Sequence, residues 1–265
     1  MVKVYKRTDD VNYTFQDLLE IMSKLRSKDG CPWDKEQTHE SIRNSVIEEA
    51  YETVDAIDSK NTDGLVEELG DLLLQIVFHS QIGYENGEFD IDDVIHGICS
   101  KLIYRHPHIF GNETAGTSEE VLDNWDTLKS KEKNFTSYTQ TLNAVPKAFP
   151  ACMRAQKVQK RAGKAGCKYD DAVLLLTTIE NKISKLKDEI KTGKNTSGEE
   201  IGKILFDTVG VAEFLKTDAE EQLSNATDNF ITSFAKSESS VTNQGLKVAG
   251  LTEKQRKDLW KDIIK

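Results

Sequence analysis

The spacing of its apolar residues is the feature that most constrains how this chain can fold. From Ile91 onward, apolar side chains recur three and four positions apart, at Ile91, Val94, Ile95, Ile98 and Leu102. That spacing places them on one face of an α-helix. Similar stripes recur along the chain, whereas the alternating β-branched pattern of strands is almost absent. The sequence therefore predicts an all-α fold.

The predicted helices fall into two groups separated by a polar stretch. Residues 134–147 are rich in Thr, Ser and Asn and are typical of a linker. We therefore expect an N-terminal domain over residues 1–133 and a C-terminal domain over residues 148–265. The expected helices are 14–27, 35–58, 63–86, 91–105 and 118–133 in the first domain, and 148–165, 171–191, 199–217, 219–236 and 252–264 in the second.

Short motifs shared by the two halves indicate an internal repeat. Gly30-Cys31-Pro32-Trp33-Asp34 is echoed by Gly166-Cys167-Lys168-Tyr169-Asp170. Ile47-Glu48 matches Ile179-Glu180, and Glu67-Glu68-Leu69-Gly70 matches Glu199-Glu200-Ile201-Gly202 at the same offset of 132 positions. Two segments that share one ungapped offset favour duplication of a single helical unit. We therefore expect two tandem helical bundles.

Composition and charge exclude several classes of protein. Of the 265 residues, 37% are hydrophobic and 30% are charged, and no apolar run approaches the roughly 18 residues of a membrane span. The polar segment Met1 to Asp10 does not resemble a secretory signal, so we expect a cytoplasmic protein without membrane partners. The four cysteines form no C-x-x-C pair, which disfavours a zinc site or a disulfide framework. A net charge of −10 disfavours stable nucleic-acid binding.

Two sets of carboxylates on consecutive predicted helices carry the main functional signal. The sets are Glu48, Glu49 and Glu52 on one helix and Glu67, Glu68 and Asp71 on the next. Each set spans about a quarter of a helix circumference, and the short connection between the helices should make them antiparallel neighbours with facing acidic sides. Such a cluster is unstable without a cation, and oxygen ligands favour Mg²⁺, with Mn²⁺ also possible. Acidic pairs on helices are more often simply solvated, but here both sets border an apolar stripe.

Cationic and aromatic residues further along fit a substrate that carries phosphate. Lys101 and Arg105 share one helix face, where they can hold phosphate oxygens. Compensation of helix C-terminal charge before Pro107 is the competing explanation. Trp125 and Lys129 form a similar pair, for which the ordinary explanation is an aromatic core anchor beside a solvated lysine.

Trp33 has two possible roles, stacking on a nucleotide base or packing in the core, and the core is the commoner of the two. Asp34 and Gln37 match a capping box for the predicted helix 35–58. The five histidines show no metal-ligand spacing joined to another motif, and no P-loop or nucleophile elbow is present. Covalent catalysis therefore has no candidate residue.

Taken together, these residues resemble the MazG family of nucleoside triphosphate pyrophosphohydrolases. The pattern Glu49-x-x-Glu52 followed by Glu68-x-x-Asp71 looks like the motif of the all-α nucleoside triphosphate pyrophosphohydrolases. The flanking segments that are similar to MazG are residues 30–34, 37–39, 48–52, 67–71, 105–111 and 124–125. The resemblance is strong over residues 14–133 and weak in the second half.

This resemblance implies a tandem all-α fold, a homodimer, and Mg²⁺-dependent hydrolysis of nucleoside triphosphates to monophosphates and pyrophosphate. By motif position, the metal ligands would be Glu49, Glu52, Glu68 and Asp71. The residues that line the substrate pocket and stabilise phosphate charge would be Lys101, Arg105, Trp125 and Lys129. The candidates for orienting or deprotonating the attacking water would be Glu48 and Glu67.

The second half departs from this pattern where it would bind metal. Aligned on the repeat, Glu49, Glu52 and Asp71 are replaced by Asn181, Ser184 and Lys203. We therefore expect a degenerate, inactive second copy that serves packing, dimerisation or regulation, and we expect activity in the first.

Two other functions fit the same residues. One is a narrower hydrolase of the same fold, directed at dUTP or phosphoribosyl-ATP, which a substrate panel would separate from a broad enzyme. The other is a regulatory protein that senses nucleotides with weak or no catalysis. The intact acidic set of the first half disfavours this second alternative there.

Overall fold

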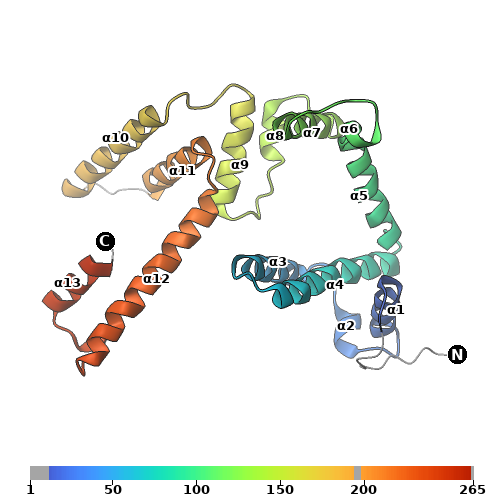
Figure 1. Ribbon diagram of the computed structural model, residues 1–265, viewed down its shortest axis with the longest axis horizontal. Helices are drawn as coiled ribbons and strands as arrows, with labels where there is room; N and C mark the ends of the chain where they lie inside the picture. The colour runs from blue at the N-terminus through green and yellow to red at the C-terminus, as the bar shows by residue number, and fades with distance from the viewer. Residues whose placement is uncertain (1–11, 194–197, 264–265) are drawn as a thin grey trace. The chain divides into compact units, whose positions relative to one another are not determined.

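The computed structural model describes residues 12–193 and 198–263, and every regular element in these ranges is a helix (Figure 1). The all-α prediction is confirmed. The chain divides into two compact units, the first unit over Met1–Lys129 and the second unit over Ser130–Lys265. The segment Met1 to Asp10, in which we expected no secretory signal, lies outside the described residues. No helix within the described ranges is long and apolar enough to span a membrane.

The helices follow one another with short connections. The first unit has α1 (Phe15–Arg26), α2 (Pro32–Glu36), α3 (Arg43–Asp58), α4 (Thr62–Asn86), α5 (Ile91–Arg105), α6 (Pro107–Phe110) and α7 (Ser118–Glu132), whose last turn runs into the second unit. The second unit continues with α8 (Tyr138–Asn143), α9 (Ala151–Lys164), α10 (Ala172–Lys191), α11 (Gly198–Phe214), α12 (Ala219–Asn243), the 3-10 turn η1 (Val248–Gly250) and α13 (Glu253–Ile263).

Local sequence signals set the ends of several helices. α1 starts with a capping box, in which the Thr14 hydroxyl accepts from the Asp17 N–H and the Asp17 carboxylate accepts from the Thr14 N–H. Asp90 and Asp93 form the same arrangement at the start of α5. α4 ends at Gly87, whose φ of 71° is the left-handed conformation that glycine adopts without steric cost. Local signals therefore mark where α4 ends and where α5 begins.

The C-terminal half of α4 forms the core of the first unit. Its residues Val77, Phe78 and Ile82 are buried together with Met22 of α1 and Ile42, which precedes α3. Burying a side chain of this size stabilises the fold by roughly 1.5–3 kcal/mol. α1 is thereby held against this half of α4, and α3 lies along the other half (Figure 1).

A buried arginine ties three segments of this unit together. The Arg26 side chain, at the end of α1, is only 4% exposed. Its guanidinium donates to both carboxylate oxygens of Glu85 on α4, and also to the carbonyl oxygens of Asp34 and Gln37. The Arg26 guanidinium carbon also lies 5.2 Å from the centre of the Phe78 ring. Burial alone would raise the pKa of Glu85, but hydrogen bonds from Arg26 and a neighbouring glutamine hold that pKa below its ordinary value.

The prediction of one continuous helix over 35–58 is wrong, because α2 ends at Glu36 and α3 begins only at Arg43. The Gln37 carbonyl oxygen accepts from Arg26 instead of continuing a helical ladder. The hydroxyls of Thr38 and Ser41 each accept from the other's backbone N–H, which stabilises a turn in place of helix.

The expectations for the start of this region also need correction. Pro32 occupies the first position of α2, and Cys31 is the residue that precedes it, so Asp34 and Gln37 do not form the predicted capping box. Trp33 does not pack in the core: its side chain is 61% exposed and meets the Phe78 ring only edge-on, with the ring centres 6.4 Å apart.

Two histidines dock the turn before α3 onto α4. His39 Nδ1 and His79 Nδ1 lie 2.7 Å apart, and their rings are nearly parallel. One nitrogen must donate and the other accept, so the contact fails when both rings are fully protonated. Burial, and then the neighbouring His39, hold the pKa of His79 below its ordinary value of 6.5. The contact that holds the chain leading into α3 therefore needs at least one of the two rings to be neutral.

We expect the stability of the protein to fall in acid partly through His79. In the unfolded chain His79 regains its ordinary pKa, so the unfolded state binds more protons and the free energy of unfolding decreases as the pH falls through 6.5. Urea unfolding at about pH 7 and about pH 5 measures this loss, which should be smaller in His79→Gln. His96→Gln, at an exposed position on α5, is the control. Equal losses in wild type and His79→Gln would contradict the assignment.

The second unit is built around α11. α9 and α10 both pack on α11, and Leu175, Ile179 and Val209 are buried there. α8 is a short helix inside the stretch 134–147 that we expected to be a linker, and the Thr141 carbonyl at its end accepts from Arg161 of α9. α12 continues past its expected end at residue 236 as far as Asn243.

Candidate functional site

The pairing of α3 with α4 brings the two acidic sets together. Residues 59–61 connect these helices as antiparallel neighbours, and Lys60 in this turn has a φ of 56° (Figure 1). Glu49 of α3 then faces Glu68 and Asp71 of α4, and one carboxylate oxygen from each lies within 4.8 Å of the other two. We call Glu49, Glu68 and Asp71 the carboxylate cluster.

Mutual repulsion is visible in the acid–base properties of the cluster. Desolvation, and then the charges of Asp71, Glu52 and Glu68, raise the pKa of Glu49 above its ordinary value. Desolvation and the charges of Glu52, Glu67 and Asp71 do the same for the pKa of Glu68. Like charges are therefore held together at a cost in free energy that a bound cation would offset.

Gln75 supports Glu49 from inside the α3–α4 interface. Gln75 is 8% exposed, and its Nε2 donates a long hydrogen bond of 3.5 Å to Glu49 Oε1. Its own Oε1 is buried without a hydrogen-bond partner in the described part of the chain. Gln75 thus orients the Glu49 carboxylate. The sequence analysis missed this residue because a glutamine within an apolar helix stripe carries no charge pattern to single it out.

The remaining predicted carboxylates surround the cluster. Glu52 lies outside the set of three, but its charge raises the pKa of both Glu49 and Glu68. Glu48 and Glu67 are exposed, each next to a member of the cluster along the chain. Five of the six predicted carboxylates therefore interact as one acidic face of the α3–α4 pair, and Glu48 is exposed beside it along the chain.

The donor set of the cluster fits a hard divalent cation. Carboxylate oxygens are the preferred ligands of Mg²⁺ and Mn²⁺, whereas zinc and copper favour nitrogen and sulfur. Three oxygens within 4.8 Å of one another can all bind a single central ion. Exposed acidic groups are common without a metal, but the raised pKa values of Glu49 and Glu68 and the contact of Glu49 with the buried Gln75 distinguish this cluster from a solvated acidic surface.

The predicted substrate residues form a second group near the end of α5. Arg105 is 5% exposed, and its guanidinium carbon lies 5.2 Å from the centre of the Trp125 ring. The His106 ring packs against the same indole, with the ring centres 4.9 Å apart. Lys101 is exposed on α5, and Lys129 is half-buried on α7. The structure therefore groups Arg105 with Trp125 and adds His106, to which the sequence analysis gave no role.

Within the first unit this second group and the carboxylate cluster are separate. After the turn at Gly87, α5 leads away from α4, so its C-terminal end lies apart from the α3–α4 pair (Figure 1). Trp33 belongs to neither group, since its ring contacts Phe78 in the C-terminal half of α4. A single copy of the first unit thus does not by itself bring Arg105 to the carboxylates.

In the second unit, a lysine stands where the first unit has Asp71. Lys203 Nζ lies 2.8 Å from Glu199 and 3.0 Å from Glu200, one turn earlier on α11. These hydrogen bonds raise the pKa of Lys203, and the bond from Lys203 lowers the pKa of Glu200. The second unit therefore neutralises its carboxylates with its own side chain.

A second ion pair replaces the contact made by Gln75. The aligned residue, Asp207 of α11, is 4% exposed and pairs with Lys182 of α10. Tyr169 also donates to Asp207, at 3.5 Å. The residue at this buried position thus contacts the neighbouring helix in both units. In the first unit the contact is a hydrogen bond from the Gln75 amide to α3, and in the second it is an ion pair between Asp207 and α10.

The chain matches known proteins over most of its length. Residues 37–110 match the sequence profile of the MazG nucleotide pyrophosphohydrolase domain. A nucleoside triphosphate pyrophosphohydrolase/pyrophosphatase MazG of Thermotoga maritima is 39% identical over 246 residues, which cover 93% of this chain and 94% of the relative. A nucleoside triphosphate pyrophosphohydrolase of Escherichia coli K12 is 37% identical over 250 residues, covering 93% of this chain and 95% of the relative.

The all-α fold and the carboxylate cluster define a class of helical proteins that gather acidic ligands between two antiparallel helices. The two relatives cover nearly the whole of both chains at well above 30% identity. The chain belongs to the MazG family of nucleoside triphosphate pyrophosphohydrolases, a family of hydrolases.

We expect divalent metal to stabilise the protein through Glu49. Without metal, Glu49→Gln should raise the melting temperature, because it removes one of three repelling charges. Added MgCl₂ or MnCl₂ should raise the melting temperature of the wild type, and this rise should shrink in Glu49→Gln, because a ligand that binds only the folded state stabilises it. Thermal unfolding followed by circular dichroism measures both effects. Asp58→Asn, at the exposed end of α3, should keep the full metal response; a full response in Glu49→Gln would remove Glu49 from the metal site.

Proposed function

We propose that the first unit hydrolyses nucleoside triphosphates to nucleoside monophosphates and pyrophosphate, with Mg²⁺ as the cofactor and Mn²⁺ as a substitute. The observation that carries this proposal is the carboxylate cluster, three acidic side chains with oxygens within 4.8 Å of one another. The cluster lies inside the segment 37–110 that matches the MazG domain. The named activity of the two relatives agrees with this reaction.

The carboxylates of the acidic face would have two different roles, metal binding and activation of water. Glu49, Glu68 and Asp71 would hold the cation, with Glu52 as the fourth predicted ligand. When bound, the cation neutralises phosphate charge and lowers the pKa of a coordinated water. Glu48 and Glu67, which are exposed next to the cluster, are the candidates for orienting that water and accepting its proton.

The group at the end of α5 serves the substrate. Lys101 and Arg105 would hold phosphate oxygens and stabilise the charge that spreads over them during displacement. Trp125 offers a ring for the base, and Arg105 already packs against that ring. Lys129 and Trp33 remain predicted substrate contacts.

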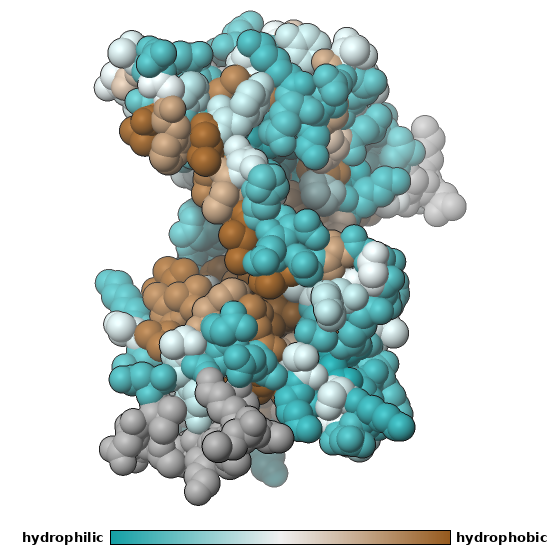
Figure 2. Space-filling model, turned by 90° about the vertical axis from the view of Figure 1, so that its right-hand side faces the viewer, coloured by the Kyte–Doolittle hydropathy of each residue, from teal (hydrophilic) through white to brown (hydrophobic). Residues whose placement is uncertain are grey.

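We also propose that two copies of the chain associate through the first unit. Large apolar side chains are open to solvent on α3, α4 and α5, and Figure 2 shows apolar residues at the surface of the face it views. Tyr51, Val54 and Leu69 are 56%, 51% and 50% exposed. Contiguous exposed apolar surface is typical of an interaction site. Association would also allow the α5 group of one copy to approach the carboxylates of the other.

A measurement of mass in solution tests the homodimer. Sedimentation velocity of the wild type should give a dimer, and Tyr51→Glu combined with Leu69→Glu should shift it toward monomer because charges would be buried at the interface. Tyr84→Glu, at a 67% exposed aromatic position on α4 away from α3, should remain dimeric. A wild-type monomer at micromolar concentration would rule the dimer out.

The second unit is proposed to be catalytically inactive. Lys203 replaces a predicted metal ligand and pairs with Glu199 and Glu200, where a metal site would need free carboxylates. The reaction is therefore assigned to the first unit alone. A cytoplasmic location and the lack of stable nucleic-acid binding stay predictions of the sequence.

A product analysis tests the reaction and its place in the chain. Purified protein is incubated with each common nucleoside triphosphate and with dUTP, with and without Mg²⁺, and the products are separated by chromatography. We expect monophosphate and pyrophosphate, only with metal. Glu68→Gln should reduce turnover by about a hundredfold or more, because it removes a metal ligand, whereas the aligned variant Glu200→Gln in the second unit should have no effect.

Other outcomes identify the alternatives. Diphosphate and phosphate as products would mean that a different bond is cleaved. Turnover of dUTP alone would assign the protein to a narrower hydrolase of the same fold. Nucleotide binding without turnover of any substrate would mean a nucleotide-sensing regulatory protein, and equal losses in Glu68→Gln and Glu200→Gln would overturn the assignment to the first unit.

A further inference from the structure

A hollow in the second unit carries a charge opposite to that of the chain as a whole. It has a volume of about 740 Å³, lies between α9 and α11, and is bordered by the residues that follow α9. This volume is typical of sites for small organic ligands. Glu213 is the single carboxylate of its lining, against four lysines. The lysines are Lys160, Lys164, Lys168 and Lys216. In a chain of net charge −10, they concentrate positive charge at one place.

Close packing gives this hollow a defined floor. A Cβ atom at Gly210 would lie 2.6 Å from Gln159 Oε1, so a larger residue there would displace the Gln159 side chain. Gln159 fills the space and donates from Nε2 to the Phe206 carbonyl oxygen, at 2.6 Å. Gly166, with a φ of 83°, reverses the chain after α9, and the Cys167 N–H donates to a carbonyl oxygen of α9. The residues after this turn therefore border the hollow.

Aromatic rings lie beside the lysines. Tyr169, Phe206 and Phe214 all line the hollow and are 41%, 43% and 44% exposed. The Tyr169 hydroxyl is held by the buried Asp207 carboxylate, which fixes the position of that ring. Half-exposed rings next to ammonium groups suit a ligand that is flat and apolar at one end and anionic at the other.

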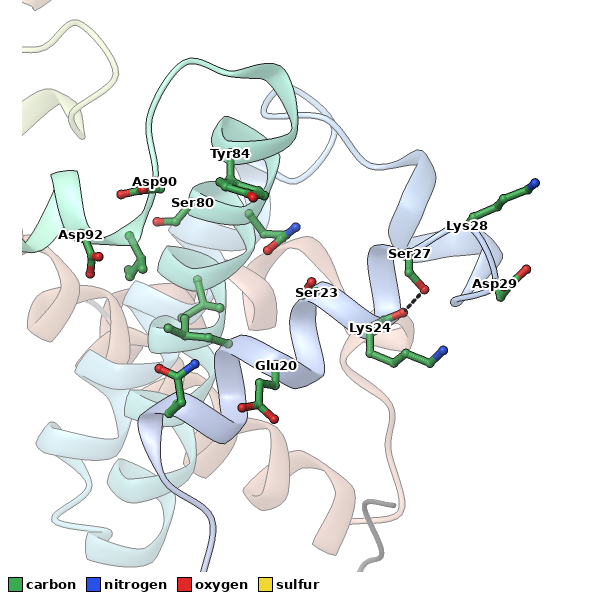
Figure 3. A pocket seen from close by; sticks show the side chains of 15 residues that line it. Glu20, Ser23, Lys24, Ser27, Lys28, Asp29, Ser80, Tyr84, Asp90 and Asp92 are labelled. Atoms are coloured by element: carbon green, nitrogen blue, oxygen red, sulfur yellow. Dashed lines mark hydrogen bonds between the residues drawn. The ribbon is translucent and has the colours of Figure 1, made fainter. Parts of the chain in front are cut away.

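The matching hollow of the first unit lacks this character (Figure 3). It lies between α1 and α4, has a volume of about 780 Å³, and is lined by more carboxylates than lysines. Its charged residues are Lys24, Lys28, Glu20, Asp29, Asp90 and Asp92. Figure 3 shows the two lysines at one end with Asp29, and Asp90 with Asp92 at the other.

The two hollows share two lysines at aligned positions and differ in their acidic residues. Lys24 and Lys28 recur 136 positions later as Lys160 and Lys164, which is the offset between Gly30 and Gly166. Two of the four acidic residues do not recur, since Glu20 becomes Gln156 and Asp29 becomes Ala165. Lysines near the ends of α9 and α11 also compensate the helix dipoles. That role accounts for lysines at helix ends but not for the loss of the acidic residues or for the exposed rings.

We propose that the hollow between α9 and α11 binds a phosphorylated nucleoside without a divalent metal. The lysine ammonium groups hold the phosphate oxygens through charge-assisted hydrogen bonds, and the rings of Phe206, Phe214 and Tyr169 contact the base. This binding site is separate from the carboxylate cluster and does not depend on catalysis by the first unit.

Cys167 provides a local probe of this site, because its free thiol is exposed on the lining of the hollow. The full chain is alkylated with iodoacetamide in EDTA, with and without the α,β-methylene analogue of ATP, and the modified peptides are quantified by mass spectrometry. At ten times its dissociation constant, the analogue should slow alkylation of Cys167 by about tenfold. Cys99, an exposed thiol on α5, should react at an unchanged rate.

Charge variants separate binding from structure. The double variant Lys160→Glu with Lys168→Glu should abolish protection of Cys167. If these reversed charges prevent folding, the double variant Lys160→Gln with Lys168→Gln replaces it and should weaken analogue binding by about tenfold or more. Lys24→Glu with Lys28→Glu, in the matching hollow of the first unit, should leave protection intact. A purely structural role predicts a lower melting temperature with protection unchanged in the lysine variants, and that result would overturn the proposal.

The choice of probe tests the two halves of the ligand. Inorganic triphosphate should protect Cys167 less well than the ATP analogue, and adenosine should protect it least. Equal protection by triphosphate would overturn the role of the aromatic rings. Protection of Cys99 in place of Cys167 would overturn the proposed binding site, and so would the absence of protection at both cysteines in EDTA. A lack of metal-dependent turnover in the product analysis would contradict the proposed reaction but not this binding site.

Discussion

The antiparallel packing of α3 on α4 holds three carboxylates together against their mutual repulsion. The apolar core on the C-terminal half of α4, around Val77 and Phe78, anchors α1 and the turn that leads into α3. The Arg26 ion pair and the His39–His79 contact fix the same turn. Hydrophobic burial and buried polar contacts thus sustain an arrangement that electrostatics alone would open, and the raised pKa values of Glu49 and Glu68 record the resulting strain.

The two units differ in how the repulsion between neighbouring carboxylates can be offset. In the first unit, Glu49, Glu68 and Asp71 lie close together and form no ion pair with a lysine or arginine of the described residues, which suits an external cation. The second unit places Lys203 against Glu199 and Glu200, so its helices pack without a metal. Substitution to lysine therefore removes the need for a cation and removes the proposed chemistry at the same time.

A loss of acidic residues also distinguishes the hollow of the second unit from that of the first. The hollow between α9 and α11 loses the carboxylates of its counterpart between α1 and α4 and retains the lysines. A unit that no longer holds a cation can present its own ammonium groups to an anion. The catalysis proposed for the first unit and the metal-free binding proposed for the second would thus depend on different charged residues on corresponding helices.

The sequence by itself determined the all-α class, most helix positions and the six carboxylates, because helical spacing and capping are local and repeat within a few residues. Only the tertiary structure decided the break at residues 37–42, the exposure of Trp33 and the role of Gln75. Each of these depends on a partner far away in the chain or on what covers a side chain: Arg26 takes the carbonyl of Gln37, and Gln75 meets Glu49 across two helices. The separation of the α5 group from the carboxylates was likewise beyond the sequence, since the direction in which α5 leaves α4 follows from packing between helices, which no local pattern records.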